Sequence, residues 1–208
     1  MESTNTMTIR KQFIKYVSLN ILSMLGTSCY ILADTFFIAN GVGADGLTSL
    51  NVAISLYSFM FSIALMIGIG GATRFALCKS RGDTDFANKV YTQTVLVGLA
   101  TGLAIAILGN LFLPRIAGAL GAAGIIQQLT IRYMRVIFSF TPFIILNQIM
   151  VAFIRNDGHP KLATIALLIS NASNIVLDYI FIYPFGWDMF GAALATALSP
   201  VISLTILS

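Results

Sequence analysis

Long apolar stretches separated by short hydrophilic gaps make up almost the whole chain. Each stretch is long enough to cross about 30 Å of hydrocarbon as a helix that rises 1.5 Å per residue. Helices satisfy their backbone hydrogen bonds internally, whereas an open sheet edge cannot face lipid, so the pattern predicts helices. The predicted spans are residues 13–40, 51–77, 90–113, 134–154, 162–183 and 190–207. We expect the polar residues 1–12 to form a cytoplasmic tail before a six-helix unit at 13–208.

The composition indicates an all-α membrane protein as well. Of the 208 residues, 57% are hydrophobic and only 10% are charged, whereas about 25% of a soluble domain is charged. The net charge of +4 comes from basic residues in the gaps, a pattern typical of topology signals and not of nucleic-acid binding. Cys29 and Cys78 lie far apart without a motif, and we interpret them as small apolar fillers.

The basic residues also predict the orientation. The N-terminal region and the gaps after the second and fourth spans lie on one side of a six-span protein and hold nine of the 12 Lys and Arg residues. Cytoplasmic loops of membrane proteins are enriched in Lys and Arg. We therefore expect both termini to be cytoplasmic, with the spans in the lipid of the cell membrane.

Two aspartates, Asp34 and Asp178, lie inside predicted spans. A carboxylate at membrane depth costs about 2.5–3.5 kcal/mol on insertion scales, so it is a functional-site hypothesis. Counting from the outer ends of their spans puts both aspartates and Thr196 at a similar depth, roughly 7–9 Å below the surface. Asn171 and Asn174 share a helical face with Asp178. Hydrogen bonding between helices is the alternative role for Asn171 and Asp178.

The oxygen atoms in this layer suit a small cation. Carboxylate, amide and hydroxyl oxygens are hard ligands for a hard cation such as Na⁺. Two neighbouring carboxylates at low dielectric also disfavour double ionisation, so the pair could instead carry H⁺. The residues leave H⁺ and Na⁺ open as the coupling ion. We predict no further metal, no cofactor and no enzymatic activity, because no catalytic set or metal-ligand spacing occurs.

Further polar residues are candidates for a substrate cavity. Tyr30 lies four residues before Asp34 and shares its face. Asn147 and Gln148 follow Pro142 on the fourth span, where they either contact a substrate or pack around a proline kink.

Two glycine-containing stretches have structural interpretations. Gly68–Gly71 lies inside an apolar span, so we expect it to allow close helix approach and not to bind phosphate. Residues 114–132 are rich in Gly and Ala, and we expect a short interfacial helix there that leads into the fourth span.

Four stretches together form a recognisable pattern. They are Tyr30–Asp34, Ser173–Tyr183, Gly191–Thr196, and Arg155–Gly158 followed by Pro160. The chain resembles the N-terminal half of the multidrug and toxic compound extrusion (MATE) family, closest to its DinF-like prokaryotic branch. The resemblance covers essentially the whole chain. It implies one lobe of a twelve-helix transporter whose two six-helix lobes enclose the substrate cavity.

The resemblance also implies roles for individual residues. The family's cation site falls on Asp34, Asn174, Asp178 and Thr196, with Tyr30 lining the same cavity. Polar cavity residues fall on Asn147 and Gln148, and Asn171 belongs with them as a substrate-cavity candidate. Val151 departs from the family, since related proteins can carry an amide there.

The expected function is that of a cation-coupled antiporter lobe that exports organic cations or similar amphipathic compounds. A second six-helix lobe, either a missing C-terminal half or a dimer partner, is expected as a partner. Because the chain stops at Ser208, we expect a fragment, a truncated product or a half that pairs with another. One alternative is a lipid-linked precursor flippase of the same superfamily, whose cavity should be basic. The other is a non-transporting half that only binds a partner.

Overall fold

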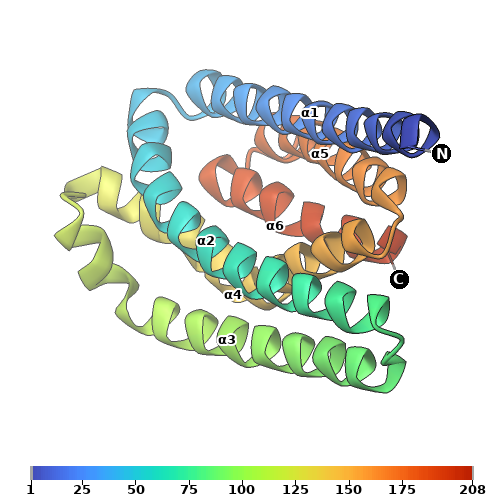
Figure 1. The fold of residues 1–208 in the computed structure, drawn as a ribbon. Helices are drawn as coiled ribbons and strands as arrows, with labels where there is room; N and C mark the ends of the chain where they lie inside the picture. The colour runs from blue at the N-terminus through green and yellow to red at the C-terminus, as the bar shows by residue number, and fades with distance from the viewer. Residues whose placement is uncertain (1, 208) are drawn as a thin grey trace.

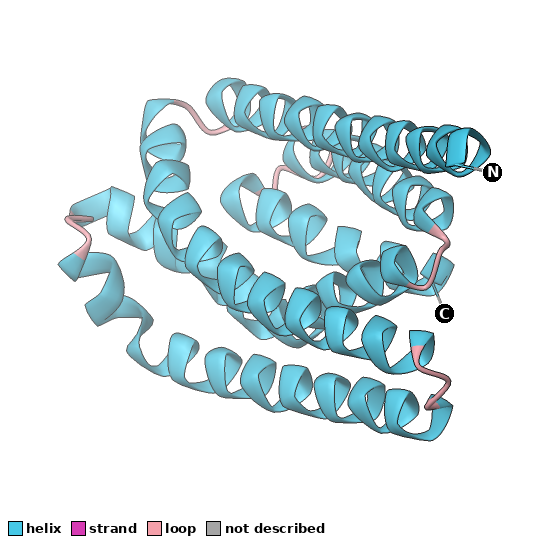
Figure 2. Ribbon diagram, in the orientation of Figure 1, coloured by secondary structure: helices cyan, strands magenta, loops and turns pink. Residues whose placement is uncertain are grey.

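The computed structural model describes the backbone of residues 2–207, and their side chains except those of residues 2–9, 12 and 15. Over this range the chain forms six α-helices and no strand (Figures 1 and 2). The helices are α1 (Glu2–Gly41), α2 (Ala44–Ser80), α3 (Thr84–Ala119), α4 (Gly124–Asn156), α5 (Pro160–Ile182) and α6 (Asp188–Leu207). All six are long and apolar enough to cross a membrane. The predicted six-span, all-α architecture is therefore confirmed.

The helices extend beyond the apolar stretches from which they were predicted. Hydropathy marks the part of a helix inside hydrocarbon, whereas the hydrogen-bonded helix continues until a residue ends it. Residues 2–12, expected as a tail, accordingly belong to α1. The turn after α1 is correspondingly short, and Gly43 adopts φ +93°, a conformation that favours glycine.

The expectation of a separate interfacial helix at 114–132 is wrong. Helix α3 continues through Pro114 to Ala119, and α4 already begins at Gly124. Proline does not stop α3 here, and the helix ends instead just before Gly121, which has φ +87°. The Gln127 side chain donates to the Pro114 carbonyl at 3.0 Å and so connects the two helices.

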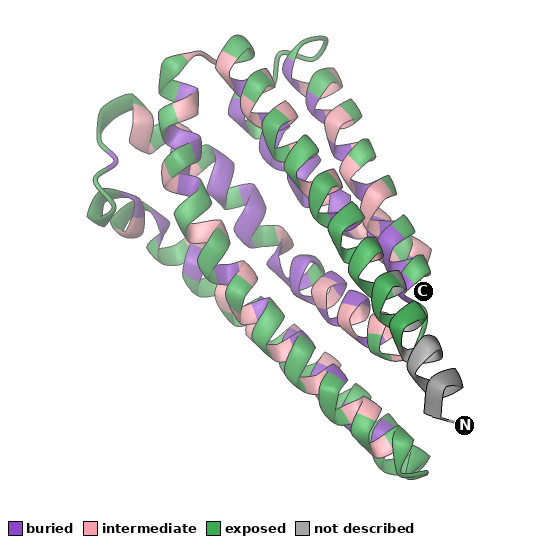
Figure 3. Cartoon of the chain, turned by 45° about the horizontal axis from the view of Figure 1, so that its top comes forward, coloured by how far each residue is buried: buried purple, intermediate pink, exposed green. Residues whose placement is uncertain are grey.

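Helices α4 and α6 form the interior of the bundle. Slightly more than half of their most apolar segments is buried, 56% in each, against 17% in α1 and α3. Helix α4 packs against α2, α3 and α6, while α1 packs mainly on α5. Figure 1 shows α1 lying along α5, and it shows that α1 begins and α6 ends at the same end of the bundle. In Figure 3 the exposed residues follow the outer sides of the helices.

Glycines allow α2 and α3 to approach α4 closely. A Cβ atom added to Gly68 would lie 3.2 Å from the Gln148 carbonyl oxygen, and one added to Gly102 would lie 2.7 Å from Pro142 Cα. Gly70 differs, since nothing lies within 4 Å of its position. The prediction that Gly68–Gly71 permits close packing therefore holds for Gly68 but not for Gly70.

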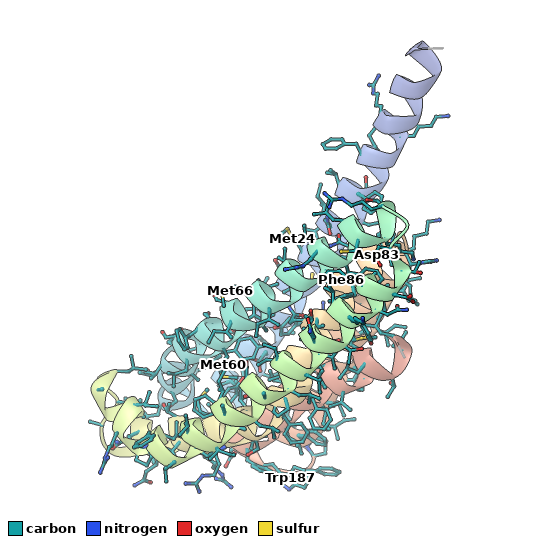
Figure 4. All side chains as sticks on the ribbon, turned by 60° about the horizontal axis from the view of Figure 1, so that its bottom comes forward. Met24, Met60, Met66, Asp83, Phe86 and Trp187 are labelled. Carbon is teal, nitrogen blue, oxygen red and sulfur yellow. The ribbon has the colours of Figure 1, made fainter. Side chains whose placement is uncertain are left out.

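The outer surface suits lipid. Leu32, Phe59, Met66 and Leu111 are each about two-thirds exposed, although all are large and apolar. Trp187 stacks on Phe181 with ring centroids 5.3 Å apart, and Figure 4 places it far from Asp83. An amphipathic aromatic cluster at a helix end is typical of the membrane interface.

Candidate cation site and transport cavity

A cavity of about 980 Å³ lies between α1, α2, α4, α5 and α6. It combines aliphatic and aromatic side chains with a limited number of polar groups, as small-molecule sites do. Seven of the eight predicted site residues line it: Tyr30, Asp34, Asn147, Gln148, Asn171, Asn174 and Thr196. The eighth, Asp178, is fully buried behind the wall.

Asp34 on α1 and Asp178 on α5 form a buried carboxylate pair. Asp34 is 7% exposed and Asp178 is 0% exposed, and the two are close enough to interact electrostatically. In each residue, Oδ1 is buried without a hydrogen-bond donor among the described residues. A buried acceptor without a partner is costly. A bound proton or cation would remove this cost at both oxygens.

Asn174 and Thr196 lie beside the two aspartates, and we call these four residues the carboxylate layer. With the Asn174 amide oriented to satisfy both of its neighbours, its nitrogen donates to Asp178 Oδ2 at 3.0 Å. Its oxygen then accepts from the Thr196 backbone N–H at 3.2 Å. In the opposite orientation the nitrogen donates only to the Thr196 hydroxyl, at 3.5 Å. We prefer the first orientation because it pairs both amide atoms.

The buried face of α5 explains how this layer forms. From Ala166 onward its buried residues recur every four positions and include Ser170, Asn174 and Asp178. This spacing puts small and polar side chains on the stripe that packs against α1 and α6. Asn171 lies at the edge of the stripe, where its amide donates to Thr27 Oγ1 at 3.4 Å.

The sequence did not single out two tyrosines near the pair. Tyr133 on α4 is 4% exposed and lines the same cavity as Thr196. Tyr57 on α2 also lines the cavity. Tyr133 was missed because it lies just outside the predicted span 134–154. The one signal for it was an aromatic hydroxyl next to a span end.

Asn147 and Gln148 face the cavity without joining the carboxylate layer. The Asn147 side chain is 5% exposed, and its Oδ1 is buried with no donor among the described residues. Within the same part of the chain, no group of three or more His, Cys, Asp or Glu could hold a metal. Any ion at the carboxylate layer would therefore be bound by two carboxylates and neutral oxygens.

Comparisons with known proteins identify the family. A profile of the MatE family matches residues 20–180, which is more than half of the chain. This chain belongs to the MATE family. Members of this family are transporters and not enzymes. Together with the six apolar helices, this makes the chain a multi-pass membrane protein.

Two relatives in Staphylococcus show how much of a MATE protein the chain represents. The multidrug export protein MepA of Staphylococcus aureus (strain MRSA252) is 30% identical over 181 residues, or 86% of this chain and 40% of the relative. MepA of Staphylococcus saprophyticus is 29% identical over 174 residues, or 84% of this chain and 39% of the relative. The chain therefore spans about 40% of the length of these curated relatives and corresponds to one MATE lobe.

Solved MATE structures have the same fold. An outward-facing multidrug resistance transporter of the MOP superfamily matches with a TM-score of 0.85 and 29% identity, over 92% of this chain and 43% of the other. A MOP superfamily transporter from Pyrococcus furiosus matches with a TM-score of 0.84 and 30% identity, over the same shares of the two chains. An inward-facing MATE transporter matches with a TM-score of 0.82 and 28% identity. This match covers 86% of this chain and 40% of the other. The lobe thus resembles both outward- and inward-facing transporters.

Proposed function

We propose that this chain is one lobe of a cation-coupled exporter that moves organic cations or similar amphipathic compounds across the cell membrane. H⁺ or Na⁺ is the coupling ion, bound by Asp34, Asn174, Asp178 and Thr196, and no organic cofactor takes part. The observation that carries the proposal is the buried carboxylate pair at the wall of a large cavity, with one unpaired oxygen on each aspartate.

The two aspartates have different roles in coupling. Asp34 reaches the cavity surface, so its charge attracts an organic cation there, whereas Asp178 lies behind it. Binding of H⁺ or Na⁺ between them neutralises the pair and removes this attraction. The ion and the substrate therefore compete, and the competition links their two gradients.

Helix α1 is the element that this neutralisation can move. It carries Asp34 and Tyr30, and it packs mainly on α5 with only limited contact to α2 and α6. When the pair is charged, repulsion between Asp34 and Asp178 acts across the seam between α1 and α5. Neutralisation favours closer packing of α1, so occupancy biases the lobe between two states.

A second six-helix lobe is part of the proposal. One lobe supplies one side of the cavity, so we propose that export needs a partner lobe. Resemblance to both inward- and outward-facing transporters supports movement of one lobe against another. We propose that both termini lie in the cytoplasm, which the nine basic residues on their side support.

The test uses the chain reconstituted in liposomes with a second six-helix lobe, where a pH or Na⁺ gradient should drive ethidium transport. Asp34→Asn and Asp178→Asn should each abolish the gradient-driven component. The double variant should lose little more, because both residues serve one site. Asp45→Asn, an exposed carboxylate in the first turn of α2, is the matched control. Gradient-driven transport that survives either single substitution would refute the shared cation site.

A further inference from the structure

Arg155, in the last turn of α4, is a cation that the carboxylate site does not use. The basic-residue pattern assigns it only a topological role, but its side chain lines the cavity. Its Nη2 donates to Ser23 Oγ at 3.1 Å, while its Nε is buried without an acceptor among the described residues. The nearest acidic residue in sequence, Asp157, pairs with Lys79 instead.

The buried hydroxyl of Ser23 holds the guanidinium, and a second buried hydroxyl, that of Thr164, lies against Ser23. Ser23 on α1 is 5% exposed and Thr164 on α5 is 2% exposed. Their hydroxyl oxygens lie 3.3 Å apart, and both can donate to the Leu19 carbonyl, at 3.0 and 3.4 Å. Arg155 is thus anchored to α1 through Nη2, and its buried Nε has no acceptor among the described residues. A planar guanidinium held in this way is suited to bidentate binding of a carboxylate or phosphate.

The position of Arg155 gives the cavity two charged ends. Ser23 and Asp34 lie on the same helix, so the guanidinium and the carboxylate pair are separated by about 16 Å along α1 at 1.5 Å per residue. Neutral side chains such as Thr27 and Asn171 line the wall between them. The cavity is therefore acidic toward the α1–α2 turn and basic at the opposite end.

We infer that Arg155 binds an anionic oxygen group, a carboxylate or a phosphate, of a molecule held in the cavity. This inference rests on the proposed function, because it takes the cavity to be the substrate cavity. It makes Arg155 the residue that selects zwitterions among amphipathic substrates, because their negative group pairs with its guanidinium. A partly buried cation with no carboxylate partner among the described side chains gains a charge-assisted hydrogen bond when such a group binds.

Two matched dyes test the inference on the purified chain in detergent. Rhodamine 19 carries a free carboxylate, and rhodamine 6G is its ethyl ester, so only the first has an anionic oxygen group. Fluorescence polarisation should show that Arg155→Gln weakens rhodamine 19 binding roughly ten- to hundredfold, the usual range for a hydrogen bond to a charged group. Rhodamine 6G binding should stay unchanged. Arg81→Gln, which removes an exposed arginine outside the cavity, should affect neither dye.

Further arms keep the outcome decisive. Sodium benzoate, an isolated carboxylate, should displace rhodamine 19 from the unmodified chain more readily than rhodamine 6G, which tests the inference even if Arg155→Gln fails to fold. Displacement of rhodamine 19 by phosphatidylglycerol would identify a lipid phosphate as a second source of the anion; without displacement, the source is a soluble carboxylate.

Three results would count against the proposal. Equal weakening of both dyes by Arg155→Gln would give Arg155 a structural role only, and unchanged binding of both would remove it from recognition. Either result overturns the inference and leaves the proposed function standing. If neither dye binds to the chain, even when it is assembled with a second six-helix lobe, both the inference and the proposed function are overturned.

Discussion

The contact between Gly102 on α3 and Pro142 on α4 gives the sharpest test of the packing. In a Gly102→Ala variant, the new Cβ would lie 2.7 Å from Pro142 Cα and 3.2 Å from its nitrogen. Both are backbone atoms inside a helix, so they cannot rotate away as a side chain would. Ordinary contacts of this kind lie at 3.4–4 Å. Helices α3 and α4 must therefore separate by most of an ångström.

The expected change in stability of Gly102→Ala follows from two opposing contributions. Overpacking of a close-packed contact costs about 1–3 kcal/mol, while Gly to Ala in a helix contributes about 0.5–1 kcal/mol in the other direction. Gly70→Ala on α2 is the matched control, because its Cβ meets nothing within 4 Å and only the favourable term remains. The favourable contribution is common to both variants, so we expect them to differ by the overpacking cost of about 1–3 kcal/mol. For a chain of this size that is roughly 2–12 °C in Tm, with Gly102→Ala the lower.

Thermal unfolding in detergent, followed by circular dichroism, measures the difference. Gly98→Ala provides an intermediate case, since its Cβ would meet mainly the end of the Ile149 side chain, which can rotate. The expected order of Tm is Gly70→Ala, then Gly98→Ala, then Gly102→Ala. A Gly102→Ala variant as stable as Gly70→Ala would refute the close approach of α3 to α4.

Three other predictions concern orientation, a surface ion pair and the carboxylate layer. In a chain without its native cysteines, a membrane-impermeant thiol reagent added outside cells should label Ala44→Cys and spare Thr84→Cys; the reverse pattern would invert the topology. Lys79→Ala should cost less than about 1 kcal/mol, because the Lys79–Asp157 pair is 51% and 33% exposed; a larger loss of thermal stability would contradict this. Tyr133→Phe removes a hydroxyl from the cavity wall that also carries Thr196 and should weaken cation binding while leaving Tm nearly unchanged, whereas a large fall in Tm with unchanged cation binding would give the hydroxyl a structural role only.

Depth along the membrane normal explains why much of the candidate site could be predicted from the sequence. Spanning helices run roughly side by side, so the distance of a residue from its helix end becomes a shared coordinate. Asp34, Asp178 and Thr196 were grouped by this count, and Asn174 was added because it shares a helical face with Asp178. The structure brings these residues into one layer. Whether they bind a cation stays a prediction.

Rotation about each helix axis and the ends of the helices were harder to predict. Depth does not reveal that Asp34 faces the cavity while Asp178 lies behind it. Hydropathy gave no reason to extend α3 past Pro114. It also placed Arg155 among the topology signals, because a charge near a span end is ordinarily solvated. Only packing against Ser23 shows that its side chain turns into the cavity.

The packing of α1 on α5 has a consequence for biosynthesis. Thr27 and Asn171, which meet across this seam, are 144 residues apart in the chain. At about 5–20 residues per second, the ribosome needs on the order of ten seconds or more to deliver α5 after α1. During this interval the Asp34 carboxylate has entered the bilayer without Asp178 beside it, at a cost of about 2.5–3.5 kcal/mol. Helix α1 is most vulnerable to membrane proteases before α5 packs against it. We therefore expect an Asp34→Asn chain to accumulate to a higher level in cells than the unmodified one.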